Sequence, residues 1–297
     1  MNNENMIQNP ILKGFNSDPS IIRVGDDYYI ATSTFEWYPG VQIHHSRDLQ
    51  NWQLVARPLK RSSQLNMLGE KNSCGVWAPC LSYDNGTYYL VYTDVKNSGT
   101  THNYLVTSDN ILGEWSDPIY LDSRGFDPSL FHDEDGKKWY SVMYLDQLAW
   151  NAMLSSNTAN INSPTAIRIW EQYKEYDKGT PLFKGILMQE YSLDEKKLIG
   201  KPKHIFGNEI GITEGSHQYK RGDYYYLLLA EGGTSYEHAV TFARSKNIEG
   251  PYVVHPQNPL ICSQGTDAYL QKTGHADLVE TKDGETYMVH LCSRPLD

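Results

Sequence analysis

The sequence predicts an all-β fold, a five-bladed β-propeller whose last blade is incomplete. The main observation is a unit that occurs five times: a strand, a turn rich in Gly, Asp or Asn, and a Tyr-rich return strand. The units start near residues 18, 78, 127, 214 and 275. A β-hairpin that recurs every 50 residues or so is typical of a propeller, in which each repeat forms one blade.

The predicted strands follow from these hairpins in chain order. The first unit opens with Asp18-Pro19-Ser20, and the third opens with the same tripeptide at residues 127–129. The five predicted hairpins cover residues 18–31, 77–92, 126–142, 213–229 and 274–290. Outer strands of the blades are predicted at residues 41–46, 53–55, 104–109, 185–192 and 240–245.

Length and composition predict one domain over residues 1–297. The chain is 39% hydrophobic and 21% charged, which is ordinary for a globular protein, and all-β folds of this length often form a single domain. The interval between the third and fourth units is the longest, so we place an insertion at about residues 147–180. A loop of this length in a compact fold is usually functional or mobile.

The fifth unit stops after its hairpin. The other units are followed by a further strand pair, but only residues 292–297 follow this one. We interpret the chain as a shortened form of something longer; the alternative is that the N-terminal segment completes the last blade. An open edge strand presents backbone N–H and C=O groups, so we expect weak activity and self-association through the C-terminal edge.

Charge and cysteine usage argue against several classes of partner and location. The net charge of −10 has no long block of one sign, which argues against nucleic acid and anionic membranes. No stretch approaches 18 apolar residues, and residues 1–10 lack a signal-peptide pattern. The four cysteines, Cys74, Cys80, Cys262 and Cys292, form no C-x-x-C pair, so we expect reduced thiols and a cytoplasmic location.

The first strands of propeller blades surround the central channel, so residues at their starts share one channel end. These positions hold Asp18, Trp77 with Ala78, Asp127, Glu214, and His275 with Asp277. Glycoside hydrolysis needs a protonated acid on the leaving oxygen and an ionised carboxylate on the opposite face of the sugar. A third carboxylate near the acid raises its pKa by repulsion between like charges. The pattern therefore predicts a glycosidase site. It contains no metal motif or phosphate-binding loop, so no cofactor is expected; an ion in the channel near His275 stays open.

The motifs around these positions resemble family 43 glycoside hydrolases, which are five-bladed propellers. Residues 9–21 are similar to the opening of that family, and residues 35–46 are similar to its β-xylosidase branch. Further similar runs cover residues 75–79, 125–131, 213–217 and 274–278. The resemblance extends along nearly the whole chain except residues 147–180, and it also implies closing strands and a C-terminal β-sandwich beyond residue 297.

The resemblance implies a role for each candidate residue. Asp18 would be the general base, Asp127 would orient the acid and modulate its pKa, and Glu214 would be the general acid. Phe35 and Trp77 would form apolar walls around the terminal sugar, with Thr234 and His275 as further members of the pocket; taken singly, Trp77 and His275 also fit plain core positions.

The expected activity is that of an inverting enzyme that releases xylose from the non-reducing end of short β-1,4-xylo-oligosaccharides. α-L-Arabinofuranosidase or dual activity is the alternative within the same chemistry. A retaining propeller of the invertase type would show Arg-Asp-Pro where Gly125-Phe126-Asp127-Pro128 stands. An inactive or merely sugar-binding truncated propeller is the alternative from a different class.

Overall fold

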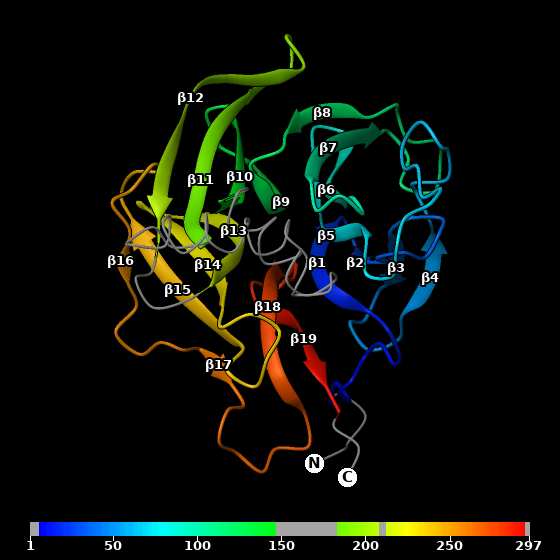
Figure 1. Ribbon diagram of the computed structural model, residues 1–297. Coiled ribbons are helices and arrows are strands. Elements are labelled where there is room, and N and C mark those ends of the chain that lie inside the picture. Colours follow the sequence, from blue (N-terminus) through cyan, green and yellow to red (C-terminus); the bar gives the residue numbers. More distant parts are fainter. Residues whose placement is uncertain (1–5, 147–182, 208–211, 295–297) are drawn as a thin grey trace, which may run out of the picture.

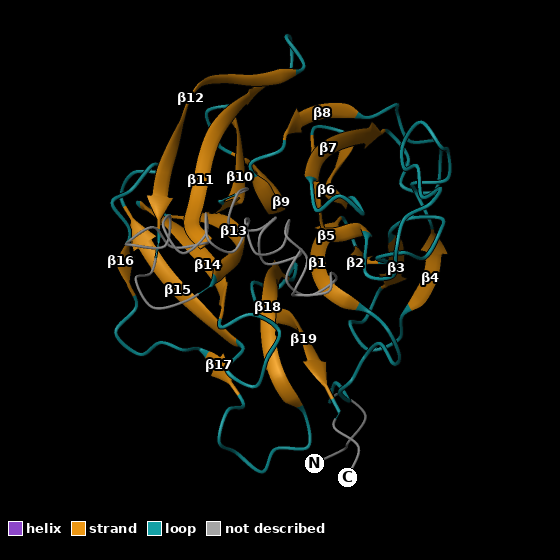
Figure 2. Ribbon diagram, viewed as in Figure 1, coloured by secondary structure: helices purple, strands orange, loops and turns teal. Residues whose placement is uncertain are grey.

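Antiparallel β-sheets arranged around a common centre make up the fold. The computed structural model describes residues 6–146, 183–207 and 212–294, and within these ranges it contains nineteen strands and no helix (Figure 1, Figure 2). In the same ranges, four sheets have four or five strands each and one sheet has two. The all-β propeller prediction is therefore confirmed, and the count of five blades stays a prediction.

The sheets follow one another along the chain. The first contains β1 (Ser17–Val24), β2 (Asp27–Ser33), β3 (Gln42–Ser46) and β4 (Gln53–Ala56). The second contains β5 (Gly75–Asp84), β6 (Thr87–Val95), β7 (Thr101–Ser108) and β8 (Ile119–Asp122). The third contains β9 (Gly125–His132), β10 (Lys138–Leu145), β11 (Phe183–Ser192) and β12 (Lys197–Phe206). The fourth contains β13 (Thr213–Arg221), β14 (Tyr224–Glu231), β15 (Ala239–Ser245), β16 (Val253–Val254) and β17 (Ile261–Cys262). The two-stranded sheet contains β18 (Gln271–Glu280) and β19 (Thr286–Ser293).

All five predicted hairpins are present as antiparallel pairs, namely β1–β2, β5–β6, β9–β10, β13–β14 and β18–β19. Their first strands, the inner strands, gather at the centre of the molecule (Figure 1). They close into a ring, because β1 contacts β5 and β18, β9 contacts β5 and β13, and β13 contacts β18. The predicted insertion at about residues 147–180 lies outside the described residues.

The hydrophobic core lies between neighbouring sheets. Ile43 of the first sheet and Tyr92 of the second belong to one cluster, and Tyr140 of the third sheet packs with residues of the second in another. The buried phenols also find acceptors: Tyr92 donates to the carbonyl of Gln64 at 2.5 Å and Tyr140 to Asp122 at 3.1 Å. Burying a large apolar side chain contributes about 1.5–3 kcal/mol, so these Tyr-rich return strands stabilise the contact between sheets.

Each inner strand carries a shift in register near the same end of the ring. In each inner strand one residue with positive φ stands at such a shift: Asp18 (50°), Ala78 (37°), Asp127 (57°), Gly215 (55°) and His275 (48°). A β-bulge inserts residues into one strand, bends it and re-aims a side chain. Positive φ is uncommon for residues other than glycine, so four of these five positions hold a strained backbone. The same bulge in each inner strand therefore turns one residue toward the central channel.

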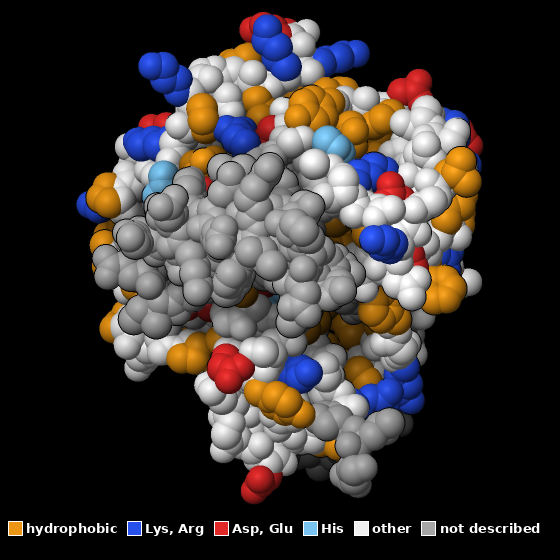
Figure 3. All heavy atoms as spheres, viewed as in Figure 1, with side chains coloured by type: hydrophobic (Ala, Val, Ile, Leu, Met, Phe, Trp, Pro, Cys, Tyr) orange, Lys and Arg blue, Asp and Glu red, His pale blue; other side chains and the backbone are white. Residues whose placement is uncertain are grey.

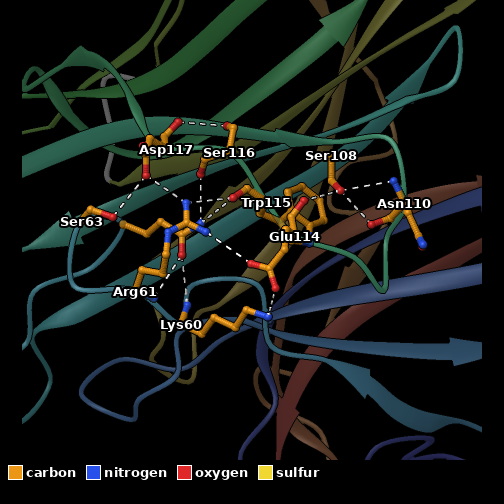
Figure 4. A network of polar contacts seen from close by, with 10 residues as sticks. Lys60, Arg61, Ser63, Ser108, Asn110, Glu114, Trp115, Ser116 and Asp117 are labelled. Carbon is orange, nitrogen blue, oxygen red and sulfur yellow. Dashed lines mark hydrogen bonds and ion pairs between the residues drawn. The ribbon is translucent and has the colours of Figure 1, made fainter.

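A polar network joins the segment after β4 to the β7–β8 connection (Figure 4). Arg61 donates to Asp117 at 2.9 Å and to the carbonyl of Trp115 at 3.0 Å, and Lys60 pairs with Glu114 at 2.5 Å. The indole of Trp115 is buried in the core between the first two sheets. The network therefore ties the outer edges of these two sheets together around an aromatic side chain. The charged partners are largely exposed, so each ion pair contributes little by itself.

The described surface mixes both signs of charge with apolar side chains. On the face in Figure 3, Lys and Arg side chains lie among Asp and Glu side chains, with scattered hydrophobic groups between them. Cys74, Cys80, Cys262 and Cys292 are free thiols, as the sequence predicts. Within the described ranges there is no helix whose length and apolar character would let it cross a membrane.

Candidate active site

Residues from the five bulges meet in one narrow cavity at the channel end. Its lining includes Asp18, Ala78, Asp127, Gly215 and His275, one from each inner strand. The bulges explain this meeting, because each one turns the chain so that its residue faces the axis. The predicted candidates Asp18, Asp127 and His275 are therefore brought together from strands that lie far apart in the sequence.

The three predicted carboxylates are all buried. Asp18, Asp127 and Glu214 are 8%, 6% and 7% exposed, so each is largely removed from water. The Nδ1 atom of His275 lies 3.5 Å from Oδ1 of Asp18 and 3.9 Å from Oδ2 of Asp127. The backbone N–H of Gly215, the neighbour of Glu214, donates to Asp127. The site thus groups three acids that water does not screen, and their charges interact strongly.

Burial and charge together favour the protonated form of Glu214. Desolvation is the larger cause and the charge of Asp18 the second, and they raise the pKa of Glu214 to about 8. Desolvation, then the charges of Glu214 and Asp18, also raise the pKa of Asp127 well above its ordinary value, against the hydrogen bond from Gly215. The resemblance implies Asp127 as the residue that modulates this pKa, but in the structure burial has the larger share and the charge of Asp18 has the rest. A carboxylic acid that keeps its proton at neutral pH can serve as a proton donor.

The imidazole of His275 lies between the carboxylates as a neutral group. Burial lowers its pKa to about 4, and the charge of Asp18 only partly opposes this effect. Its ring packs over Gly215, where an added Cβ would stand 2.9 Å from Nε2 of His275. Glycine is therefore required at residue 215 both for this contact and for its positive φ. His275 belongs to the site cavity, not to the hydrophobic core.

The predicted apolar walls form part of a chain of aromatic rings. Phe35, two residues after the end of β2, lies 5.8 Å from Trp77 between ring centroids, and Trp77 lies 5.4 Å from Phe126. Phe15 extends the chain, 5.4 Å from Phe35. The resemblance implied Phe35 and Trp77 as walls but not Phe15 or Phe126, although Phe126 stands directly before Asp127 as Trp77 stands directly before Ala78.

A groove of about 590 Å³ adjoins the site next to β19. Asp18, Phe35 and Thr234 line it together with Leu270 and Arg294. The structure thus places Thr234 on the same groove as Asp18, in the β14–β15 connection. Arg294 lines the groove too, although in the sequence it stands too early to be an obvious substitute for the substrate-binding arginine that the resemblance implies.

Asp277, an expected member of the constellation, lies elsewhere. It lines a separate cavity among the inner strands with Arg23, Tyr83 and Glu280, not the cavity that holds Asp18. There it accepts hydrogen bonds from Ser20 and from the backbone of Ile21, and it pairs with His217 at 3.6 Å. Burial is the largest single effect and lowers the pKa of His217, but Asp277 and Cys80 together outweigh it and raise this pKa to about 9.

Ser33 is a further polar residue at the site that the sequence did not reveal. Its hydroxyl donates to Oδ2 of Asp18 at 2.5 Å and accepts the backbone N–H of Ala78 at 2.7 Å. Ser33 pairs with Ser17 in the β1–β2 register, directly before the bulge at Asp18. No group of His, Cys, Asp and Glu in the described part of the chain is arranged to hold a metal ion.

A propeller with three buried carboxylates at one channel end, among them a protonated Glu214, has the features of a glycoside hydrolase site. The comparison with known families agrees. The model of Glycosyl hydrolases family 43 matches residues 7–180 and 168–297, and the chain belongs to that family.

Two curated relatives and one solved structure are similar to this chain along nearly its whole length. The chain is 55% identical to Xylosidase/arabinosidase 43B of Humicola insolens, across 97% of this chain and 49% of that one. It is 54% identical to the Beta-xylosidase of Bacillus subtilis (strain 168), across 98% and 50%. The crystal structure of xylan beta-1,4-xylosidase from Bacillus Halodurans C-125 superposes with a TM-score of 0.86 at 56% identity, across 98% and 51%. The chain thus spans about half the length of the curated relatives that it matches.

Proposed function

We propose that this chain is the catalytic propeller of an inverting glycoside hydrolase that releases xylose from the non-reducing end of short β-1,4-xylo-oligosaccharides. One observation carries the proposal: Glu214 has a pKa of about 8 in a site where Asp18, Asp127 and His275 converge. Such a site pairs a proton donor with carboxylates in a buried pocket. The names of the most similar relatives, which include xylosidases, support the choice of sugar.

Each residue takes one role in the proposed reaction. Water attacks the anomeric carbon while Asp18 accepts its proton, and the new carbon–oxygen bond forms as the glycosidic bond breaks. Glu214 gives its proton to the departing oxygen, so that Asp18 ends protonated and Glu214 ionised, and solvent exchange restores both. A single displacement of this kind inverts the anomeric centre. Asp127, which accepts a hydrogen bond from the backbone N–H next to Glu214, orients the acid, and the charge that raises the pKa of Glu214 comes from Asp18.

The residues of the sugar pocket and the identity of the sugar are proposed from the family resemblance and the names of the relatives. Phe35 and Trp77 form the apolar wall of the sugar site, and Thr234 and His275 supply polar contacts. α-L-Arabinofuranosidase activity is the second candidate, supported by the double name of the Humicola insolens relative. The partner is a small oligosaccharide and not nucleic acid, as the net charge of −10 favours.

We also propose that the fold has five blades, with β18 and β19 as the incomplete fifth. The closed ring of inner strands and the bulge common to all five support this count. The single-domain organisation and the cytoplasmic location remain proposals from the sequence.

The proposal is tested by hydrolysis of 4-nitrophenyl β-xyloside, 4-nitrophenyl α-L-arabinofuranoside and xylobiose, with xylose binding measured in parallel. We expect β-xyloside cleavage to be the faster, and proton NMR to show the α-anomer of xylose as the first product. Asp18→Asn should abolish turnover while xylose still binds. First appearance of the β-anomer would contradict inversion, and binding without hydrolysis by the unmodified protein would identify a sugar-binding propeller instead.

A further inference from the structure

The hydroxyl of Ser33 lies where three segments meet. It stands at the end of β2, between the bulge of β1 that holds Asp18 and the bulge of β5 that holds Ala78. The side chain is completely buried, with 0% exposure. Paired backbone hydrogen bonds between Phe35 and Val76 clamp the next residues of the two segments together. Ser33 therefore cannot reach a sugar in the pocket, and any effect on the reaction passes through another residue.

The hydrogen-bond capacity of a hydroxyl fixes the direction of its contacts. A serine hydroxyl has one proton to donate and two lone pairs to accept with. The N–H of Ala78 occupies a lone pair at 2.7 Å, so the single proton goes to Oδ2 of Asp18 at 2.5 Å. A bond from a hydroxyl to an ionised carboxylate is among the stronger hydrogen bonds in proteins. Both contacts are thus made at once by one rigidly held atom.

This bridge leaves the two oxygens of Asp18 in different situations. Oδ2 is held by Ser33, whereas Oδ1 lies 3.5 Å from Nδ1 of His275, which lines the site cavity together with Asp18. A general base must present one oxygen in a fixed direction to the water that it deprotonates. The positive φ of Asp18 sets the backbone, but the rotation of the carboxylate about its last bond is set by Ser33.

We propose that Ser33 is a positioning residue for Asp18: its hydroxyl, fixed by the N–H of Ala78, holds Oδ2 so that Oδ1 is presented to the attacking water. The inference rests on the proposed function, because it needs Asp18 to be the general base. It adds the group that decides which carboxylate oxygen acts.

The structure offers a matched control in the same strand pair. Ser20 is also buried, donates to the carboxylate of Asp277 at 3.0 Å and accepts the backbone N–H of Leu81 in β5 at 3.1 Å. It makes the same kind of bridge, but to a carboxylate outside the site cavity. Ser20→Ala and Ser33→Ala therefore remove equivalent hydrogen bonds, and only one of them touches the proposed base.

The test compares these variants on 4-nitrophenyl β-xyloside and on xylobiose. Ser33→Ala should lower kcat by about 10- to 100-fold, part of the roughly 100-fold or larger effect of a general base, with KM changed less than threefold. The loss should be similar on both substrates, because the water needs its base whatever the leaving group. Ser20→Ala should keep kcat within about threefold of the wild type. It should lower the melting temperature by about as much as Ser33→Ala does, because the two variants lose equivalent hydrogen bonds.

Ser33→Thr, which keeps a hydroxyl, should retain most of the wild-type kcat. A Ser33→Ala variant with unchanged kcat would overturn the inference, as would a Thr variant as slow as the Ala variant. Equal losses of kcat in Ser20→Ala and Ser33→Ala would assign the effect to general loosening of the ring and also overturn it. Absence of hydrolysis by the wild type would overturn the proposed function itself, a result distinct from these.

Discussion

Replacing Glu214 with glutamine should make the protein more stable at neutral pH while it loses activity. Burial and Asp18 raise the pKa of Glu214 from 4.5 to about 8 in the folded protein. A group whose pKa is raised on folding stabilises the fold fully below its unfolded pKa, and this contribution is lost as the pH rises toward the folded pKa. Glutamine has nearly the same shape as glutamate and does not ionise, so the stability of Glu214→Gln should not fall with pH through this group.

The size of this stability difference follows from the gap between the unfolded and folded pKa values of Glu214. One pH unit between the two pKa values corresponds to about 1.4 kcal/mol, so the wild type should lose about 2–3 kcal/mol more than the variant between pH 5 and 7. Urea unfolding followed by tryptophan fluorescence at pH 5, 6 and 7 measures this difference. Glu195→Gln is the control, since Glu195 is 53% exposed and pairs with Lys197 at the surface. Its stability should follow the wild type at every pH within about 0.5 kcal/mol. Parallel pH dependences of the wild type and Glu214→Gln would refute the reasoning.

Three further outcomes are expected. Glu214→Ala should slow xylobiose hydrolysis far more than hydrolysis of activated aryl xylosides, which need little proton donation, whereas equal losses would show that Glu214 is not the acid. The pKa of about 8 for Glu214 places the basic limb of kcat/KM near pH 8, and a profile flat to pH 10 would contradict this. β19 pairs only with β18 among the described residues, so the 297-residue chain should self-associate through this edge, which sedimentation at several concentrations would detect; a monomer throughout would count against it.

The hairpins and the carboxylates could be predicted because their signals are local. A strand, a turn with glycine and a return strand lie within about 20 residues, and the repeated Asp-Pro-Ser marks where two inner strands begin. Once the repeats indicate a propeller, the starts of the inner strands must meet at the axis. Asp18, Asp127 and His275 therefore converge as predicted, without any knowledge of side-chain contacts.

Ser33 and Asp277 could not be assigned in the same way. The contact of Ser33 with Ala78 joins residues 45 apart in sequence and depends on two bulges, which no local pattern announces. Asp277 follows His275 by two residues, and in a regular strand both would face the same side. The register shift at residues 274–276 and the positive φ of His275 separate them, so Asp277 bonds to Ile21 in another cavity.

The repeated bulge has a consequence for how the chemistry of this ring can change. In each inner strand the main chain does the aiming, so the group that reaches the channel depends on the identity of one residue at or beside the bulge. Asp18, Asp127 and His275 carry reactive groups there, while Ala78 carries only a methyl. Asn and Asp tolerate positive φ better than other side chains, and either would leave the N–H of Ala78 with its bond to Ser33. Residue 78 is therefore the position in this ring where a polar side chain would face the reactive groups while the path of the main chain stays the same.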